Sequence, residues 1–169
     1  MYAREKAGPD AATRGFTLVE MMISMAIGLI ILLGMMMMFI SDAKVSDTMA
    51  SRTDRLSDLF LVSQIMQGEL RNAQAGTISW SSNVLSYTNQ DGNSGSFAYQ
   101  YSGNNDAIYW LRPTFSAYQE MIRDLDTTSG MVVSGTASGV WTITLKSSYQ
   151  DVDRTTKTVD LSFKVWARN

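Results

Sequence analysis

One carboxylate stands alone in a long apolar stretch near the start of the chain. From Phe16 to Ile40 there are 25 residues, and Glu20 is the only charged one among them. A carboxylate inside an apolar membrane segment costs at least about 2.5 kcal/mol on insertion scales, so its presence there indicates a function. If the chain were cut between Gly15 and Phe16, a new ammonium on Phe16 would lie one helical turn from Glu20. The sequence thus predicts ion pairing between these two groups, on one chain or between neighbouring chains.

Few other residue types in the chain could do chemistry. The sequence contains no cysteine and no histidine, which excludes disulfides, Cys/His zinc sites and Cys or His nucleophile–base pairs. Nothing in the sequence predicts a catalytic residue, a cofactor-binding residue or a metal ligand, so we expect no enzyme. The sequence also has no basic patch, so we expect no direct nucleic-acid binding.

Two close acidic pairs in the later part of the chain leave one binding question open. They are Asp124 with Asp126, and Asp151 with Asp153. Calcium prefers several oxygen ligands from carboxylates and carbonyls, but neither pair has the EF-hand spacing. Solvated loop charge is the simpler interpretation, and the sequence does not decide whether either pair binds calcium.

The apolar stretch has the length of a membrane-spanning helix. A backbone in lipid must satisfy its own hydrogen bonds, so residues 16–40 are expected to be helical there. At about 1.5 Å per residue this helix would be about 37 Å long, enough to span a bilayer core of about 30 Å with some tilt. Arg4, Lys6 and Arg14 precede it and favour a cytoplasmic N-terminus, which puts the C-terminal domain across the membrane.

Residues 41–169 are predicted to form one domain outside the membrane, beginning with a second helical part. No proline occurs between Asp42 and Ala75, and apolar residues recur there at spacings of three or four. An amphipathic helix is therefore expected over about 42–75, with Gly76 as its stop. Its apolar face is predicted to consist of Leu56, Leu59, Val62, Met66, Leu70 and Ala73.

The remaining part, residues 77–169, is predicted to be β-rich. Its composition changes to Ser, Thr, Gly, Asn and aromatic residues in short alternating runs, which is the pattern of antiparallel strands. Residues 97–101 and 108–111 should form a hairpin, whereas residues 118–125 fit either a strand or a short helix.

The two clearest strand patterns lie near the end of the chain. The alternating runs 141–146 and 159–165 should pair across a loop at 147–155. The predicted fold class is therefore α+β. A long N-terminal helix, whose first half spans the membrane, packs on an antiparallel β-sheet.

The N-terminal residues carry a family resemblance. The stretch Arg14-Gly15-Phe16-Thr17-Leu18-Val19-Glu20, followed by an apolar helix, resembles the processing motif of type IV pilins and type II secretion pseudopilins. In that superfamily a membrane-embedded prepilin peptidase cuts after the glycine and N-methylates the new terminal residue. The resemblance implies a leader over residues 1–15, cleavage between Gly15 and Phe16, N-methylation of Phe16, and an assembly carboxylate at Glu20.

Two ordinary interpretations of the N-terminal region fit less well. A secretory signal peptide has an apolar region of about 7–15 residues, much shorter than residues 16–40. A plain single-pass anchor has no use for Glu20.

The resemblance also implies a structural function. The chain would be a minor pilin or pseudopilin, stored in the bacterial inner membrane with residues 41–169 in the periplasm. It would be extracted into a type IV pilus or a type II secretion pseudopilus, as part of the initiation or tip complex. Its partners would be other pilins or pseudopilins, the prepilin peptidase, and an inner-membrane assembly platform with a separate ATPase. The run Glu69-Leu70-Arg71-Asn72-Ala73 is similar to one in W-type minor pilins and J-type pseudopilins.

A second functional class stays open beside this one. The chain could be a membrane-anchored adhesin or binding module displayed by the same machinery. Aromatic residues at strand spacing would then line a binding surface, although such residues more often pack in a core or pair across strands. The candidates are Trp80, Tyr99, Tyr101, Tyr109 and Trp110.

Overall fold

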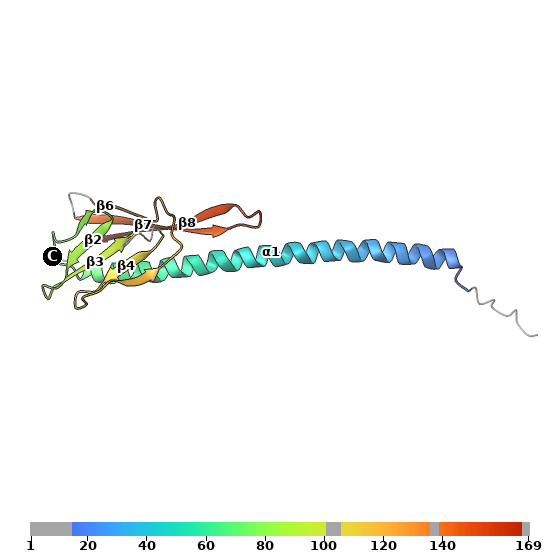
Figure 1. Cartoon of the computed structure of the whole chain (residues 1–169), viewed down its shortest axis with the longest axis horizontal. Coiled ribbons are helices and arrows are strands. Elements are labelled where there is room, and N and C mark those ends of the chain that lie inside the picture. The colour runs from blue at the N-terminus through green and yellow to red at the C-terminus, as the bar shows by residue number, and fades with distance from the viewer. Residues whose placement is uncertain (1–14, 101–105, 136–138, 167–169) are drawn as a thin grey trace, which may run out of the picture. The chain divides into compact units, whose positions relative to one another are not determined.

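A computed structural model of the chain describes residues 15–100, 106–135 and 139–166. These ranges contain the helix α1 (Leu18–Arg71) and the strands β1 (Ser79–Ser81), β2 (Val84–Thr88), β3 (Ser94–Tyr99), β4 (Ile108–Leu111), β5 (Gln119–Ile122), β6 (Met131–Gly135), β7 (Val140–Gln150) and β8 (Thr156–Trp166), shown in Figure 1. The chain divides into two compact units, one ending at Ala43 and the other beginning at Lys44. Helix α1 contributes residues to both units.

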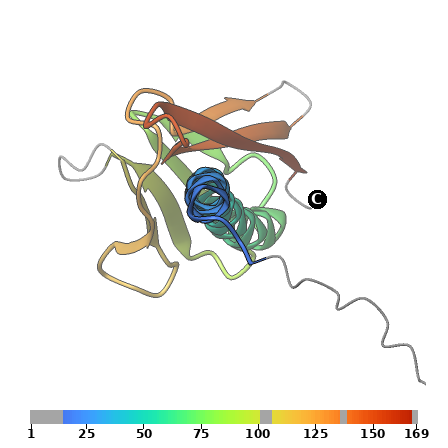
Figure 2. The same cartoon turned by 90° about the vertical axis from the view of Figure 1, so that its right-hand side faces the viewer.

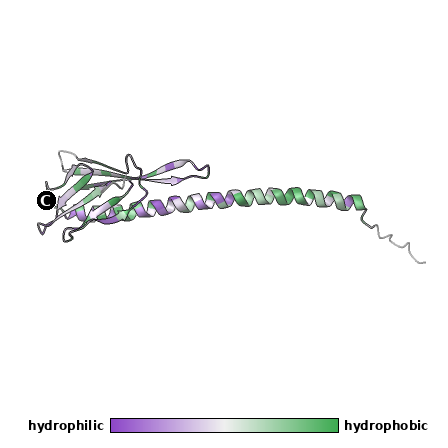
Figure 3. Cartoon of the chain, in the orientation of Figure 1, coloured by the Kyte–Doolittle hydropathy of each residue, from purple (hydrophilic) through white to green (hydrophobic). Residues whose placement is uncertain are grey.

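The part of α1 in the first unit is apolar on all sides. Its side chains are exposed almost throughout, and the hydropathy of this part is high enough for a helix to cross a membrane. Figure 3 shows the hydrophobic residues concentrated in the first half of α1, with polar residues mixed in afterwards. A helix that is apolar all round suits a nonpolar surrounding, whereas the later part of α1 has one buried face.

Helix α1 ends at Arg71, four residues before the end predicted from the sequence. The Asn72 amide still bonds to the carbonyls of Gly68 and Glu69, but the Gln74 amide donates to the Thr88 carbonyl at 2.8 Å. Ala73 forms an isolated bridge with Asn89, so the chain leaves the helix in order to pair with the end of β2. Gly76 does not stop the helix but takes a positive φ of 75° in the turn that follows.

The apolar face of α1 agrees with the prediction except at its first residue. Leu59, Val62, Met66 and Leu70 are buried, and so is Ala73 beyond the helix end. Leu56 was predicted to lie on this face, but 37% of it is exposed. The prediction was wrong there because helical spacing identifies a face and cannot say where along the helix the covering strands stop.

The first sheet is an antiparallel meander in the order β1-β2-β3-β4-β5. The predicted hairpin is confirmed as the β3–β4 pair, in which Phe97 faces Trp110, although Tyr101 lies outside the described residues. The ambiguous segment 118–125 contributes the edge strand β5, which pairs with β4 through a register shift between Ile108 and Tyr109.

The second sheet is an antiparallel meander in the order β6-β7-β8. The predicted pairing near the end of the chain is confirmed, with Ile143 opposite Phe163 and Leu145 opposite Leu161. The strands are longer than predicted, since β7 reaches Gln150 and β8 begins at Thr156. The connection is therefore a turn at 151–155, closed by a hydrogen bond from the Asp151 amide to the Thr155 carbonyl.

The core of the second unit lies where α1 meets both sheets. Figure 2, viewed along the helix, shows the two sheets on adjacent sides of the later part of α1. The segment between β5 and β6 joins the sheets, because the Leu125 amide donates to the Asp106 carbonyl and the Asp126 amide donates to the Lys146 carbonyl. The largest fully buried side chains come from α1, from both sheets and from the segment between β5 and β6, and they are Tyr87, Phe97, Leu59, Met66, Leu70, Leu85, Ile108, Leu125, Ile143, Leu145, Val62 and Val165.

A polar contact inside this core ties α1 to the first sheet. The Tyr87 hydroxyl donates to the Glu69 carboxylate at 2.9 Å and accepts from the Trp110 indole nitrogen at 3.1 Å. Burial raises the pKa of Tyr87 far above its usual range, so the phenol stays neutral and donates. Gly95, opposite Tyr87 in β3, makes room for the ring, since a Cβ there would lie 2.6 Å from it.

Truncation of Leu70 should cost much of the stability of the second unit. Leu70→Ala removes a fully buried side chain and is expected to lower the free energy of unfolding by about 2–5 kcal/mol. Leu56→Ala is the matched control, and it should change stability little because Leu56 is exposed. Denaturant unfolding of the detergent-solubilised chain, followed by tryptophan fluorescence, measures both, and equal losses would contradict this placement of the helix face.

Candidate functional site

The backbone on either side of the predicted cleavage point is not helical. Residues 15–17 have no regular secondary structure, and α1 begins at Leu18. The Phe16 side chain is 83% exposed. The Gly15–Phe16 peptide bond therefore precedes the helix and is not held in its hydrogen-bond ladder, so an enzyme could approach it without unwinding a turn.

Thr17 and Glu20 form a reciprocal cap at the start of α1. The Thr17 amide and hydroxyl both donate to Glu20 Oε2, at 2.9 and 3.0 Å, and the Glu20 amide donates to Thr17 Oγ1 at 3.2 Å. This is the capping-box arrangement, which satisfies two backbone amides that a helix start would otherwise leave unpaired. It fixes the boundary between the non-helical residues 15–17 and the helix.

The cap uses only part of the Glu20 carboxylate. A carboxylate can accept about four hydrogen bonds, and Oε2 receives both of those from Thr17. Glu20 Oε1 accepts none within the described part of the chain. Glu20 can therefore keep its cap and still present one oxygen to a cation, and the positive end of the helix dipole stabilises its negative charge.

The structure brings together the three residues that the sequence singled out. Gly15 and Phe16 lie in the non-helical residues directly before α1 and Glu20 lies in its first turn, whereas Arg14 and the rest of the predicted leader lie outside the described residues. The capping role of Thr17 was not predicted from the sequence. Its signal was present, because a Thr followed three residues later by Glu is the pattern of a capping box.

The first acidic pair is engaged by the protein itself. Asp124 pairs with Arg55 of α1 at 2.7 Å. Hydrogen bonds from the backbone and side chain of Ser129 hold the pKa of Asp126 below its usual range. These contacts account for both carboxylates without an ion.

The second acidic pair likewise shows no arrangement for calcium. Asp151 pairs with Lys157, which lowers the pKa of that carboxyl, and it also accepts a hydrogen bond from the Val152 amide. Among the described residues, no group of three or more acidic side chains lies close enough to hold a metal ion. The described geometry therefore supports no calcium site at either pair.

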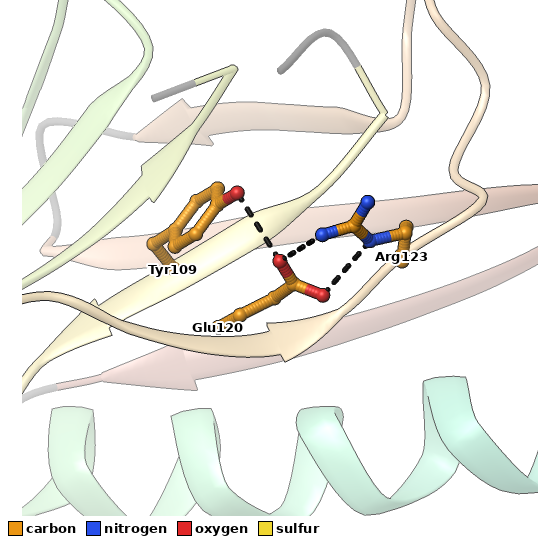
Figure 4. Close-up of polar contacts among 3 residues, drawn as sticks. All are labelled: Tyr109, Glu120 and Arg123. Atoms are coloured by element: carbon orange, nitrogen blue, oxygen red, sulfur yellow. Dashed lines mark hydrogen bonds and ion pairs between the residues drawn. The ribbon is translucent and has the colours of Figure 1, made fainter. Parts of the chain in front are cut away.

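The aromatic candidates do not gather on one surface. Tyr99 and Trp110 are buried in the core, Trp80 packs against it, and Tyr101 lies outside the described residues. Tyr109 joins a surface network shown in Figure 4, donating to Glu120 at 3.2 Å.

That network places charged side chains along β5, the edge strand of the first sheet. Arg123 donates to both Glu120 oxygens, at 2.9 and 2.5 Å, and this contact lowers the pKa of Glu120. Charged side chains at an edge strand discourage pairing with another sheet. The network therefore has a structural explanation and does not indicate a binding site.

Comparison with known proteins finds a match at the N-terminal end of the chain. Residues 11–36 match the family model described as the prokaryotic N-terminal methylation motif. No curated protein and no solved structure matches the chain. The chain thus carries a prepilin-type methylation motif, whose matched residues include Gly15, Phe16, Thr17 and Glu20, in front of an α+β, pilin-like fold.

Loss of the Thr17 side chain should loosen the first turn of α1. Thr17→Ala removes two of the three capping hydrogen bonds and is expected to cost about 1 kcal/mol of local helix stability. Amide hydrogen exchange at residues 18–21 in detergent micelles measures the effect, and exchange should become several-fold faster. Thr17→Ser keeps the hydroxyl and is the control, so equal exchange in the two variants would contradict the capping role.

Proposed function

We propose that this chain, which carries the N-terminal methylation motif, is a structural minor pilin or pseudopilin. The prepilin peptidase cuts it between Gly15 and Phe16 and methylates the new N-terminus, and the mature chain enters a type IV pilus or a type II secretion pseudopilus. The observation that carries the proposal is the motif match over residues 11–36, in which the proposed cleavage point lies in non-helical backbone directly before a capped apolar helix.

The proposed division of the chain follows from the helix. Residues 1–15 are the leader, residues 16–40 span the bacterial inner membrane, and residues 41–169 form the periplasmic domain. In its favour, α1 is long and apolar enough to cross a membrane, and the part up to Ala43 forms a unit of its own. Before assembly the lipid covers the apolar surface. In the filament, neighbouring apolar helices replace that cover.

Glu20 is proposed to guide assembly through its charge. Hydrolysis of the Gly15–Phe16 peptide bond converts the Phe16 amide nitrogen into an amine, which is protonated to an ammonium. Thr17 retains its amide, so the cap on Glu20 can persist. Glu20 Oε1 is then available to the Phe16 ammonium of a neighbouring subunit. In a surrounding of low dielectric constant this attraction is strong enough to set the register between helices.

The proposed partners are other pilins or pseudopilins, the prepilin peptidase, and an inner-membrane platform with a separate ATPase. We favour the W-type minor pilins or J-type pseudopilins because of the run at residues 69–73, which ends α1 and enters the first sheet. The resemblance places no such glutamate in the K-type tip subunit, so Glu20 argues against that role. An adhesin is not favoured, since Tyr99 and Trp110, two of its candidate aromatics, are buried.

Processing should produce an N-terminus at Phe16. Mass spectrometry of the protein isolated from cells with prepilin peptidase should find a chain that starts with N-methylated Phe16. Gly15→Val should leave the leader attached, because a branched side chain obstructs the approach of the peptidase to the backbone. Gly15→Ala adds only a methyl group and is the control. A mature N-terminus at any other residue would refute the assignment.

Substitution of Glu20 should separate capping from assembly. Glu20→Gln can keep the cap, since Gln also serves at this position of a capping box, but it removes the charge. Glu20→Ala removes the charge and also the two capping hydrogen bonds that Glu20 Oε2 accepts. Because the proposed role depends on charge, both variants should be inserted and cut almost normally and both should be depleted from sheared filaments relative to membranes.

Fractionation with quantitative immunoblotting compares the two Glu20 variants with the unchanged chain. Normal incorporation of Glu20→Gln together with loss of Glu20→Ala would show that capping, and not charge, is what assembly needs. Equal incorporation of all three chains would remove Glu20 from the assembly mechanism.

A further inference from the structure

One row of side chains follows a single face of α1 through the second unit. Its later part is buried and consists of Leu59, Ser63, Met66 and Leu70, spaced four, three and four residues apart. The same alternation continues towards the N-terminus in four exposed residues, which we name the open seam. The open seam consists of Val45, Met49, Arg52 and Leu56.

The apolar surface of the open seam is extended by Phe60, which is 56% exposed. At about 100° per residue, Phe60 lies beside Leu56 and Met49 on the helix surface. Exposed apolar side chains are unremarkable when scattered singly, but a continuous row on one helix face marks a contact surface. Alternation of three and four residues is also the spacing by which two helices pack along each other.

The domain covers a different side of α1 at this height. A groove there separates the helix from the turn between β7 and β8, and its lining is mostly polar. On the helix it is lined by Lys44, Asp47, Thr48 and Ser51, and on the turn by Gln150, Asp151, Val152 and Arg154. The side that faces the domain's own strands is thus polar, whereas the apolar residues lie on an uncovered flank. Packing against the domain's own strands would instead require the apolar residues on the covered side and the polar residues on the uncovered side.

Arg52 is the one charged residue in the open seam. It makes no ion pair within the described part of the chain. Arg55, three residues later, differs in this respect because it pairs with Asp124 at 2.7 Å. A charged residue at a seam position selects the partner, because it needs an opposite charge across the contact. The open seam is therefore complementary to an apolar helix that carries a carboxylate at the height of Arg52.

We infer that the open seam binds a parallel helix of a different membrane-anchored chain, which places a carboxylate opposite Arg52. This inference rests on the proposed function, because it takes residues 16–40 to lie in the membrane. Two helices that rise from the same membrane on the same side run in the same direction, and their spans share one depth.

A second copy of this chain fits the open seam poorly. At equal depth, Arg52 of one copy would face Arg52 of the other, and like charges at a seam position repel. Asp47, Asp54 and Asp58 cannot relieve that repulsion, because helical geometry puts them on the opposite side of α1. The open seam thus favours an unlike partner over self-association.

The inference is tested with introduced thiols, since the chain has no cysteine of its own. Met49→Cys is placed in the full chain and in a full chain that also carries Arg52→Glu, each with its own tag. Both are co-produced and oxidised in isolated membranes, where the Arg52→Glu chain is the probe for an acidic helix of the same shape. The mixed disulfide dimer joins an Arg52 chain to an Arg52→Glu chain. Its yield should be roughly two- to fivefold higher than random pairing of the two chains would give, and high salt should reduce this excess.

Matched variants test whether the preference belongs to the open seam. Ser57→Cys, about a third of a turn away from the seam, should show no dependence on charge. Phe60→Ser should reduce the mixed dimers, whereas Leu61→Ser should not, because Leu61 is equally exposed, at 59%, but lies on another side of α1.

Three results would overturn the inference. They are equal yields of mixed and same-charge dimers, the same charge preference at Ser57→Cys, and equal effects of Phe60→Ser and Leu61→Ser. Mass spectrometry of the same samples reports cleavage after Gly15. A correctly cut chain without charge preference would overturn the open-seam inference alone, and an uncut chain would overturn the proposed function together with it.

Discussion

The burial of one face of α1 against two separate sheets is the contact on which the rest of the domain depends. Each sheet is a meander of neighbouring strands, and its inner side chains need an apolar layer to face. Leu59, Met66 and Leu70 provide that layer at the point where the sheets meet. The Tyr87–Glu69 hydrogen bond fixes the helix against the first sheet, and the Arg55–Asp124 ion pair ties it to the segment that leads into the second.

The same helix satisfies different demands along its length. Up to Ala43 it is exposed and apolar, between Lys44 and Asp58 it is mixed, and from Leu59 onward it is the core of a folded domain. The cap at Thr17 gives this helix a defined start. Glu20 caps the helix through Oε2. Under the proposed function the same side chain also recognises an ammonium, which depends on its charge, whereas the cap depends on oxygen geometry.

Short-range patterns in the sequence predict the type of each element, because the periodicity of apolar residues reflects which side chains face the core. Alternation identified the strands around Trp141 and Leu161, and hydropathy identified the apolar part of α1. The early end of the helix could not be predicted in this way, because it follows from the pairing of Ala73 with Asn89, sixteen residues later. The exposure of Leu56 depends on where strands far along the chain stop. At the candidate site, the charge of Glu20 singles it out in the sequence. The three-residue spacing from Thr17 to Glu20 is also visible there, but the hydrogen bonds between them were not predicted.

The order of the elements along the chain has a consequence for folding during synthesis. The helix face that fills the core is made first, and the strands that cover it are made last, with Val159 and Val165 near the end of the chain. Helix-to-sheet contacts therefore join residues far apart in sequence, which slows folding compared with a bundle of local contacts. Until β8 has emerged, Leu59, Met66 and Leu70 have no complete cover, and the nascent domain is exposed to premature association with other unfinished chains.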